Sequence, residues 1–454
     1  MPTRLIESLA TTDAFADLFS DRSVLQAMLD FEVALARAEA RVGIVPQAAA
    51  DAIAAAAKSE AFDAAKLAKD ALLAGALAIP FVKALTERVR ASNPAAAGFV
   101  HWGATSQDVS DTALVLLLKH AQPILESDLA RLEVALRRMA EQHANTVMLG
   151  RTLLQAAPPT TFGLKAAGWL GSIHRCRVRL AAAFAETLIV QLGGATGTLA
   201  SLGQQGVAVG CALAEELQLG FPDAPWHTHR DRIAALVCAC GVLTGSLGKM
   251  ARDISLLMQN EVSEVAEPSR PGRGGSSTMP HKRNPSACVA TLAAANRVPG
   301  HVATFLSAMV QEHERAVGVW QAEWPTIAAL VQATGVATAS MAEAAEGLSV
   351  DAARMRTNID ATRGVVFSER ALMLLGEKLG RDVARKLLEE AARQSAAQGR
   401  HFAQVLGEMP EVTRHLDRAM LQRLEAPEEY LGSADAFRKR LLAFAEKGAD
   451  DEKE

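Results

Sequence analysis

The sequence predicts an all-α protein built around a central bundle of long helices, and three observations favour this class. Helical periodicity covers most of the 454 residues, whereas candidate strands are few and short and show no β-α-β alternation. Aromatic residues make up only 4% of the chain, with a single tyrosine, so small and aliphatic side chains must fill the core. Such side chains let helices approach one another closely, which favours long bundles.

The composition is that of a globular protein without an unusual charge. Hydrophobic residues account for 50%, charged residues for 22%, and the formal net charge is −4, which gives no reason to expect nucleic acid or a membrane surface as a partner. The five cysteines show no CxxC spacing and are expected to be buried free thiols in a reducing cytoplasm. The first residues carry no signal peptide, and no apolar run approaches the length of a membrane span, so we expect a cytoplasmic protein.

The first strong helix signal is "LDFEVALARAEARVG", residues 29–43. Small and apolar residues occupy one face of this helix, while Glu32, Arg37, Glu39 and Arg41 are assigned to the opposite, polar face. Gly43 follows where a C-terminal cap belongs. A helix of this kind packs one side on a core and exposes the other.

Longer helices follow. "SDTALVLLLKHAQP" is nearly all apolar, as expected of a deeply buried helix, and Pro123 should kink this helix rather than end it. Leucines and a methionine from Leu125 to Met139 continue it at spacings of three and four. Further long helices are predicted over roughly 159–191, 204–219, 228–266, 285–312 and 322–348, followed by shorter, more charged helices. We expect an N-terminal helical domain over 1–108, a central bundle over 109–350 and a C-terminal helical domain over 351–454.

Polar residues gather where the helices are interrupted. In "HWGATSQDVSDT", residues 101–112, Asp108 or Ser110 could cap the next helix, and the free N–H groups there could hold a carboxylate. In "GRTLLQAAPPTTFG", residues 150–163, polar residues are followed by two prolines that are expected to open the next helix. Each segment alone is better explained as an ordinary loop or helix cap.

The third interruption is "EPSRPGRGGSSTMPHKRNP", whose loop 268–284 combines glycines, hydroxyls and basic residues. Asn284 and Pro285 read as the N-cap and first residue of a helix, and Arg270 and Arg273 add positive charge. The glycine spacing is not that of a P-loop. An exposed linker is the alternative, but we favour a lid over a multiply anionic ligand. Further along, Arg315 is a candidate carboxylate clamp, because a guanidinium binds a carboxylate bidentately.

Other site classes find little support. The sequence contains no HExxH, and "HTH" at 227–229 offers only two ligands, so no metal site is predicted. No GxSxG elbow surrounds Ser276 or Ser277.

Taken together, the three interruptions resemble the three motif regions of the fumarase/aspartase superfamily, in the same order. "QLGGATGTLASLG", "EHER" and "PEEYLGSADAFRKRLL" extend the resemblance over nearly the whole chain. It implies a homotetramer whose active sites combine motif regions from three subunits. It also implies β-elimination, or the reverse addition, on a small polycarboxylate through an aci-carboxylate carbanion, with no cofactor.

The resemblance also implies roles for individual residues. Ser276 would transfer the carbon-bound proton, with Ser277 or Lys282 as the next candidates, and His101 matches a histidine of the adenylosuccinate-lyase branch. The proposed catalytic residues are therefore Ser276, Lys282 and His101, and the proposed substrate-binding residues are Thr105, Ser106, Arg151, Thr152, Gln155, Ser277, Met279, Asn284 and Arg315.

One departure from the lyase pattern concerns the chemistry. Adenylosuccinate and argininosuccinate lyases carry a catalytic histidine where "RTLLQ" has Leu153. Leucine cannot protonate a leaving amine, whereas a carboxylate, with a pKa near ~4, attacks or leaves as an anion without an acid. This favours the cycloisomerase branch of the superfamily, in which a substrate carboxylate adds to a diene to form a lactone in aromatic catabolism. The alternatives are a lyase whose acid comes from another segment and an inactive structural relative.

Overall fold

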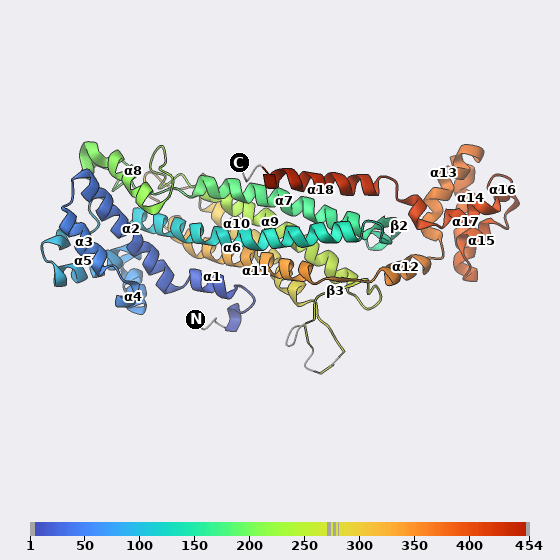
Figure 1. Ribbon diagram of the computed structural model, residues 1–454, viewed down its shortest axis with the longest axis horizontal. Helices are drawn as coiled ribbons and strands as arrows, with labels where there is room; N and C mark the ends of the chain where they lie inside the picture. The colour runs from blue at the N-terminus through green and yellow to red at the C-terminus, as the bar shows by residue number, and fades with distance from the viewer. Residues whose placement is uncertain (1–4, 270–273, 276–277, 280, 451–454) are drawn as a thin grey trace. The chain divides into compact units, whose positions relative to one another are not determined.

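The computed structural model describes residues 5–450 except 270–273, 276–277 and 280 (Figure 1). The predicted all-α class is confirmed, and most of the described chain is helical. The α-helices are α1 Asp13–Leu18, α2 Asp21–Val42, α3 Gln47–Ala56, α4 Ala64–Ala74, α5 Ala78–Ser92, α6 Ser106–Gln142, α7 Phe162–Thr187, α8 Gly206–Leu217, α9 Asp231–Leu257, α10 Ser286–Ser307, α11 Val319–Glu346, α12 Ala352–Asp360, α13 Ser368–Leu379, α14 Arg381–Gln398, α15 Phe402–Leu406, α16 Pro410–Thr413, α17 Arg418–Leu424 and α18 Ala434–Asp450. The short 3-10 helices are η1 Leu5–Glu7, η2 Ser59–Ala61, η3 Ala96–Phe99, η4 Ala200–Gln205, η5 Val365–Phe367 and η6 Pro427–Tyr430. The strands of the described residues are β1 Val147–Thr152, β2 Gln155–Thr161, β3 Val265–Ala266 and β4 Ser349–Val350.

The chain divides into two compact units. Unit 1 comprises Met1–Leu129, Cys176–Gly248 and Ala290–Ser340, and unit 2 comprises Ala130–Arg175, Lys249–Val289 and Met341–Glu454. The boundaries fall inside the long helices α6, α7, α9, α10 and α11, so each of these helices contributes residues to both units. The three-domain division at residues 108 and 350 stays a prediction.

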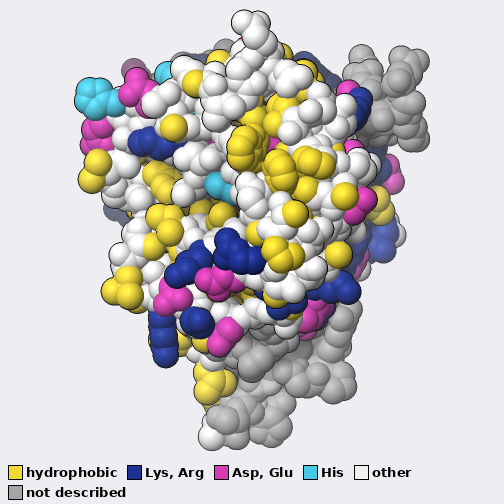
Figure 2. Space-filling model, turned by 90° about the vertical axis from the view of Figure 1, so that its left-hand side faces the viewer, with side chains coloured by type: hydrophobic (Ala, Val, Ile, Leu, Met, Phe, Trp, Pro, Cys, Tyr) yellow, Lys and Arg dark blue, Asp and Glu magenta, His cyan; other side chains and the backbone are white. Residues whose placement is uncertain are grey.

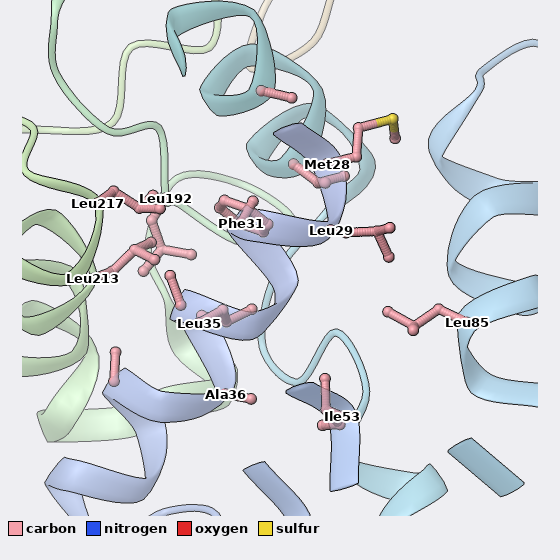
Figure 3. Packing of buried hydrophobic residues seen from close by; sticks show 14 of the residues in the cluster. Met28, Leu29, Phe31, Leu35, Ala36, Ile53, Leu85, Leu192, Leu213 and Leu217 are labelled. Atoms are coloured by element: carbon pink, nitrogen blue, oxygen red, sulfur yellow. The ribbon is translucent and has the colours of Figure 1, made fainter. Parts of the chain in front are cut away.

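The core of unit 1 is built around α2 (Figure 3). Phe31 of α2 lies on the side of Leu213 of α8, whereas Leu29 points toward Leu85 of α5, and Ile53 of α3 lies below. These side chains are buried because α2 has helices on more than one side. Burying a leucine or phenylalanine side chain contributes about 1.5–3 kcal/mol, so this core accounts for much of the stability of unit 1.

The packing of α2 corrects one expectation from the sequence. Glu32 and Glu39, assigned to the polar face, are 1% and 0% exposed. Arg37 and Arg41 are exposed and pair with acidic residues of α8. The expectation was wrong for the two glutamates because several neighbouring helices surround α2, so its buried face is wider than one stripe. The helix does end at Gly43 as predicted, with φ at 85°.

Within unit 1 the long helices pack against one another. Thr244 of α9 hydrogen-bonds Thr334 of α11, Arg177 of α7 pairs with Glu126 of α6, and Gly248 of α9 lies against α10. The predicted long helices are confirmed with shorter ends, except that α11 begins at Val319 instead of 322, and α6 continues through Pro123. Together with α2, the helices α6, α7, α9, α10 and α11 are the longest of the described chain (Figure 1).

Two of the long helices are more apolar than the sequence reading allowed. By length and composition alone, α9 and α11 could each cross a membrane, which contradicts the expectation that no apolar run approaches such a span. In the protein, 61% of the most apolar 18-residue stretch of α9 and 67% of that of α11 are buried. Burial by neighbouring helices is therefore sufficient to explain their composition.

Unit 2 contains a β-hairpin that the sequence analysis missed. β1 and β2 pair antiparallel through a turn at Leu153 and Leu154, whose φ angles are 49° and 65°. Pro158 and Pro159 lie in β2 and do not open a helix, since α7 begins at Phe162. A two-residue hairpin turn with positive φ at both positions is of type I′, for which Asn-Gly is the usual signal and Leu-Leu is not.

The surface carries charges of both signs. Figure 2 shows basic and acidic side chains interspersed with apolar ones on one face of the molecule. The mixture agrees with the small net charge of −4. The five cysteines are free as expected, although Cys211 is exposed and Cys238 is only half-buried.

Candidate active site

Asp108 organises the first motif, at the start of α6 in unit 1. Its carboxylate accepts hydrogen bonds from the backbone N–H groups of Thr105, Gly193 and Gly194 at 2.9–3.0 Å. His227 Nε2 lies 2.6 Å from Asp108 Oδ1. The carboxylate is fully buried, and these donors offset the desolvation of its charge. Because α6 begins at Ser106, neither Asp108 nor Ser110 is its N-cap, and the Asp108 carboxylate instead links Thr105 to the 193–194 loop.

Gly193 is required for the contact between His227 and Asp108 for a steric reason. A Cβ atom there would lie 2.5 Å from the ring of His227 and 2.8 Å from Pro225. Glycine therefore lets the imidazole approach the 193–194 loop closely enough to reach Asp108. His227 was considered in the sequence only as one of two metal ligands in "HTH", and its contact with Asp108 was missed.

A second buried cluster surrounds Arg230, which precedes α9. The guanidinium donates two hydrogen bonds to Asp111 of α6 at 2.7 and 3.1 Å, and further ones to Glu323 of α11. Trp320 Nε1 also donates to Asp111, and the guanidinium lies over the ring of Trp226, 4.7 Å from its centroid. All three charged groups are buried.

The charges of this cluster depend on one another. Burial alone would lower the pKa of Arg230, but Asp111 and Glu323 raise it above its ordinary value. Burial raises the pKa of Glu323 in spite of its pairing with Arg230. Arg230 therefore links the beginnings of α6, α9 and α11. Its removal would leave two buried carboxylates without a counter-ion, which would cost a large part of the stability.

Arg315, the predicted carboxylate clamp, lies beside the first motif. Its guanidinium donates to Gln107 Oε1 at 3.1 Å, to the Gly194 carbonyl at 2.6 Å and to the Ala195 carbonyl at 3.2 Å. Burial lowers the pKa of Arg315 below its ordinary value, and Asp108 acts in the opposite direction. These contacts place a half-buried cation beside Gln107, in the first turn of α6, while using some of its donors within the fold.

His101 has a defined partner. Its Nδ1 atom lies 2.6 Å from Oε1 of Glu32, and the two side chains are 14% and 1% exposed. The backbone of His101 is left-handed, with φ at 58°, which is uncommon for a residue other than glycine. His101, Thr105, Ser106 and Arg315 all belong to unit 1, and the charge of Asp108 acts on both His101 and Arg315.

The remaining predicted site residues that the structure describes belong to unit 2. Arg151 forms two hydrogen bonds with Glu264, at 2.7 and 3.0 Å, and also donates to the Leu149 carbonyl. Glu264 is fully buried and also accepts from Asn358 at 2.8 Å. Arg151 thus serves as the counter-ion of a buried carboxylate, a structural role that the sequence did not reveal.

Thr152 and Gln155 are Cα partners at the end of the hairpin and are both exposed. Between them, Leu153 is 97% and Leu154 is 77% exposed. Two exposed leucines in left-handed conformations are unfavourable in an isolated loop, because Cβ strain and hydration of apolar surface both oppose them. The structure thus displays at the hairpin tip the residue that replaces the lyase histidine.

The third motif is described in part. Ser276 and Ser277 lie outside the described residues, as do Arg270 and Arg273. Met279 and Lys282 are exposed, and the Lys282 N–H donates to the Met279 carbonyl at 3.1 Å. Asn284 closes the loop, since its N–H donates to Gly274 O at 2.8 Å and its Nδ2 to Gly275 O at 3.2 Å.

The start of α10 differs from the prediction that Asn284 caps it. The helix begins at Ser286, and the Glu267 carboxylate accepts from the N–H groups of Ala287 and Cys288 at 3.0 and 2.9 Å. A carboxylate from the chain itself thus occupies the N-terminus of α10. Burial and the contact with Glu267 raise the pKa of the Cys288 thiol, which keeps this cysteine protonated.

The acids that organise the site were largely missed from the sequence. Glu32 and Glu39 follow Leu25 at intervals of seven residues, so all three lie on one buried stripe of α2. This seven-residue spacing from Leu25 could have predicted from the sequence that both glutamates are buried. Nothing comparable marks Glu264 or Glu267, whose partners lie far along the chain or in another element. In the part of the chain that the structure describes, no group of three or more His, Cys, Asp or Glu side chains is arranged to hold a metal ion.

Comparison with known families shows a match over most of the chain. A family model described as "Lyase" matches residues 7–300, and one described as "Adenylosuccinate lyase C-terminus" matches residues 364–441.

Individual relatives match over nearly their full length. The chain is 48% identical over 443 residues to a 3-carboxy-cis,cis-muconate cycloisomerase of Bradyrhizobium diazoefficiens, covering 98% of each chain. It is 45% identical over 431 residues to a nitrosuccinate lyase of Streptomyces davaonensis, covering 93% of this chain and 91% of that protein. The crystal structure of the 3-carboxy-cis,cis-muconate lactonizing enzyme from Pseudomonas putida aligns with a TM-score of 0.92 at 46% identity, over 98% of this chain and 99% of that one.

Proposed function

Because this chain belongs to the fumarase/aspartase family of lyases, we propose that it is the enzyme that converts 3-carboxy-cis,cis-muconate to 4-carboxymuconolactone. The observation that carries the proposal is the 48% identity, over 98% of both chains, to a relative named for this reaction. The reaction is a step of protocatechuate catabolism, and we place it in the cytoplasm. Leu153, which stands where amine-releasing lyases have an acid, supports the same assignment.

The proposed reaction forms one carbon–oxygen bond within the substrate. A substrate carboxylate oxygen attacks one end of an activated double bond, and the electron pair of that bond moves into the conjugated carboxylate, giving an aci-carboxylate. Proton transfer to the adjacent carbon completes the lactone. One carboxylate charge disappears, so each turnover takes up one proton from solvent.

The residues of unit 1 suit binding of the anionic substrate. Thr105 and Ser106 lie in a segment that Asp108 fixes, with the Arg315 cation beside it. Donors and cations placed before the reaction stabilise the charge that develops on an aci-carboxylate. We assign Thr105, Ser106 and Arg315 to one carboxylate of the substrate.

The residues of unit 2 supply the rest of the proposed machinery. Lys282 is an exposed cation that stabilises the aci-carboxylate, and Ser276 delivers the proton to carbon. Thr152, Gln155 and Asn284 are assigned to hydrogen bonds with the substrate. Arg151 is a weaker candidate than its position in the motif implied, because its guanidinium already neutralises Glu264.

A second candidate function comes from the relative named nitrosuccinate lyase, at 45% identity. Its name implies elimination of nitrite, which leaves as an anion and, like a carboxylate, needs no general acid. Leu153 therefore argues against release of an amine, but does not distinguish lactonisation from elimination of nitrite.

We further propose a homotetramer in which three subunits contribute to each active site. Exposed apolar side chains support a partner for this chain: Leu153 and Leu154 at the hairpin tip, and Val178, Val242 and Val289 on long helices, each at least 49% exposed. Burial of such surface drives association. Light scattering coupled to size-exclusion chromatography tests the assembly, and a monomer with full activity would contradict it.

The direct test measures diene absorbance and proton stoichiometry on purified protein in a weakly buffered solution. With 3-carboxy-cis,cis-muconate, we expect loss of diene absorbance and uptake of one proton per turnover. With nitrosuccinate, an eliminating enzyme would instead form fumarate and nitrite and release a proton. Adenylosuccinate and argininosuccinate serve as controls, from which no fumarate is expected. Turnover of nitrosuccinate with an unchanged diene would overturn the assignment, as would fumarate from either control.

A further inference from the structure

His101 is held in a way that capping of α6 does not require. The segment before α6 is already tied by Asp108, which accepts from the Thr105 N–H. His101 nevertheless adopts a left-handed backbone with φ at 58°. Such conformations cost about 1–3 kcal/mol and persist where the surrounding structure imposes them, often at functional sites.

The partner of His101, Glu32, is an unusual residue for a buried position of a helix. Glu32 is 1% exposed, its Oε1 lies 2.6 Å from His101 Nδ1, and its Oε2 has no hydrogen-bond partner. Removing a carboxylate from water is costly unless it is paired, so an apolar residue here would serve the core of unit 1 better. The contact uses Nδ1 and leaves Nε2 as the ring nitrogen available to a ligand.

Two carboxylates act on the His101 ring, and a third carboxyl group lies further along α2. Glu32 of α2 contacts the ring directly and Asp108 of α6 acts on it from nearby, whereas the charge of Glu32 also acts on Glu39, two turns further along α2. Burial alone would lower the pKa of His101, but the charges of Glu32 and Asp108 raise it above its ordinary value. Glu39 has its own pKa raised to about 9 and is therefore a neutral acid at neutral pH.

We infer that Glu32 is a positioning residue that fixes the His101 ring through Nδ1 and maintains it as an imidazolium whose Nε2–H binds a substrate carboxylate. The identity of that carboxylate rests on the proposed function, whereas the pairing itself does not. A charge-assisted hydrogen bond of this kind is about twice as strong as a neutral one. It also supplies unit 1 with a second cation besides Arg315 for a substrate with three carboxylates.

The substitution Glu32→Gln separates this role from packing. Glutamine retains an oxygen that can accept from Nδ1 but removes the charge, so His101 loses its proton at a lower pH than in the wild type. We expect the alkaline limb of kcat/KM to move to lower pH, and KM at pH 8 to rise about tenfold with kcat changed less than about twofold. Glu32→Asp retains the charge and should restore part of the shift.

The matched control is Glu39→Gln, a buried glutamate on the same helix that is already neutral. Its pH profile should coincide with that of the wild type. A purely structural Glu32 would instead change the profile little while lowering stability, or would lower kcat at every pH. Either of those results would overturn the inference.

A measurement on the substrate-free wild-type protein keeps the inference testable if the variants do not fold or the proposed reaction fails. The His101 ring signal, assigned by its loss in His101→Gln, is titrated by NMR with selectively labelled histidine. Titration above the ordinary histidine pKa supports the imidazolium whatever the substrate proves to be. Titration at or below that value refutes it. Absence of turnover in the wild type together with a raised titration would refute only the assigned substrate.

Discussion

Replacing Glu39 with glutamine removes a carboxyl group that the core of unit 1 holds without any hydrogen-bond partner. Both oxygens of Glu39 are buried and unpaired, and the residue is 0% exposed. Burial, reinforced by the charge of Glu32, raises the pKa of Glu39 from 4.5 to about 9. In the folded protein this side chain is therefore protonated at neutral pH, whereas in the unfolded chain it is ionised.

The sign and size of the effect on stability follow from this difference. A group whose pKa is raised by folding stabilises the folded state fully below its unfolded pKa and loses that contribution as the pH rises toward its folded pKa. Between pH 4.5 and 7, a span of 7 − 4.5 = 2.5 units, the wild type loses about 3 kcal/mol from this one residue. Glutamine does not titrate, and it replaces a neutral acid of nearly the same shape, so Glu39→Gln removes this loss.

The assay compares denaturant unfolding of wild type and Glu39→Gln at pH 5, 6, 7 and 8 and at one protein concentration. The two proteins should have similar stabilities at pH 5. The variant should then gain about 1.4 kcal/mol over the wild type with each pH unit. Glu87→Gln, a change at an exposed glutamate of α5, controls for loss of a negative charge and should show no such trend.

A constant difference between wild type and Glu39→Gln from pH 5 to pH 8 would refute the reasoning. It would mean that Glu39 is ionised in the folded protein, which requires a partner or water that stabilises its charge. A variant that is less stable at every pH would point to an amide that the site cannot accommodate, and would count against the neutral-acid assignment equally.

Three further predictions concern the site. Ser276→Ala should abolish turnover of 3-carboxy-cis,cis-muconate while chromatography shows an unchanged assembly. Ser277→Ala should retain most activity. The opposite pattern would identify Ser277 as the residue that transfers the proton. Arg230→Met leaves Asp111 and Glu323 as uncompensated buried charges, so unfolding experiments should show a loss of about 3–5 kcal/mol, and a loss under 1 kcal/mol would contradict the buried-pair argument. Gly193→Ala places a Cβ 2.5 Å from the His227 ring and should lower stability by about 1–3 kcal/mol, measured as a shift in denaturation midpoint; no shift would show that the 193–194 loop yields freely.

The helices were predictable because local patterns specify them. The apolar stripe of α2 and the αL glycine at its end, Gly43, are both encoded within one segment and were recognised there. The hairpin was not, because its turn places Leu153 and Leu154 at positive φ against the preference of leucine. Such a turn is imposed by the pairing of β1 with β2, which a local pattern does not reveal.

For the site, the sequence by itself determined which side chains are available: the motif segments, their order, and the leucine that replaces an acid at position 153. Tertiary structure alone decided how those side chains are used. It paired Arg151 with Glu264, placed Arg315 against Gln107, and joined His101 to Glu32, 69 residues away. The physical reason is that the cost of burying a charge depends on partners brought in by the fold, and no single segment of the chain contains them.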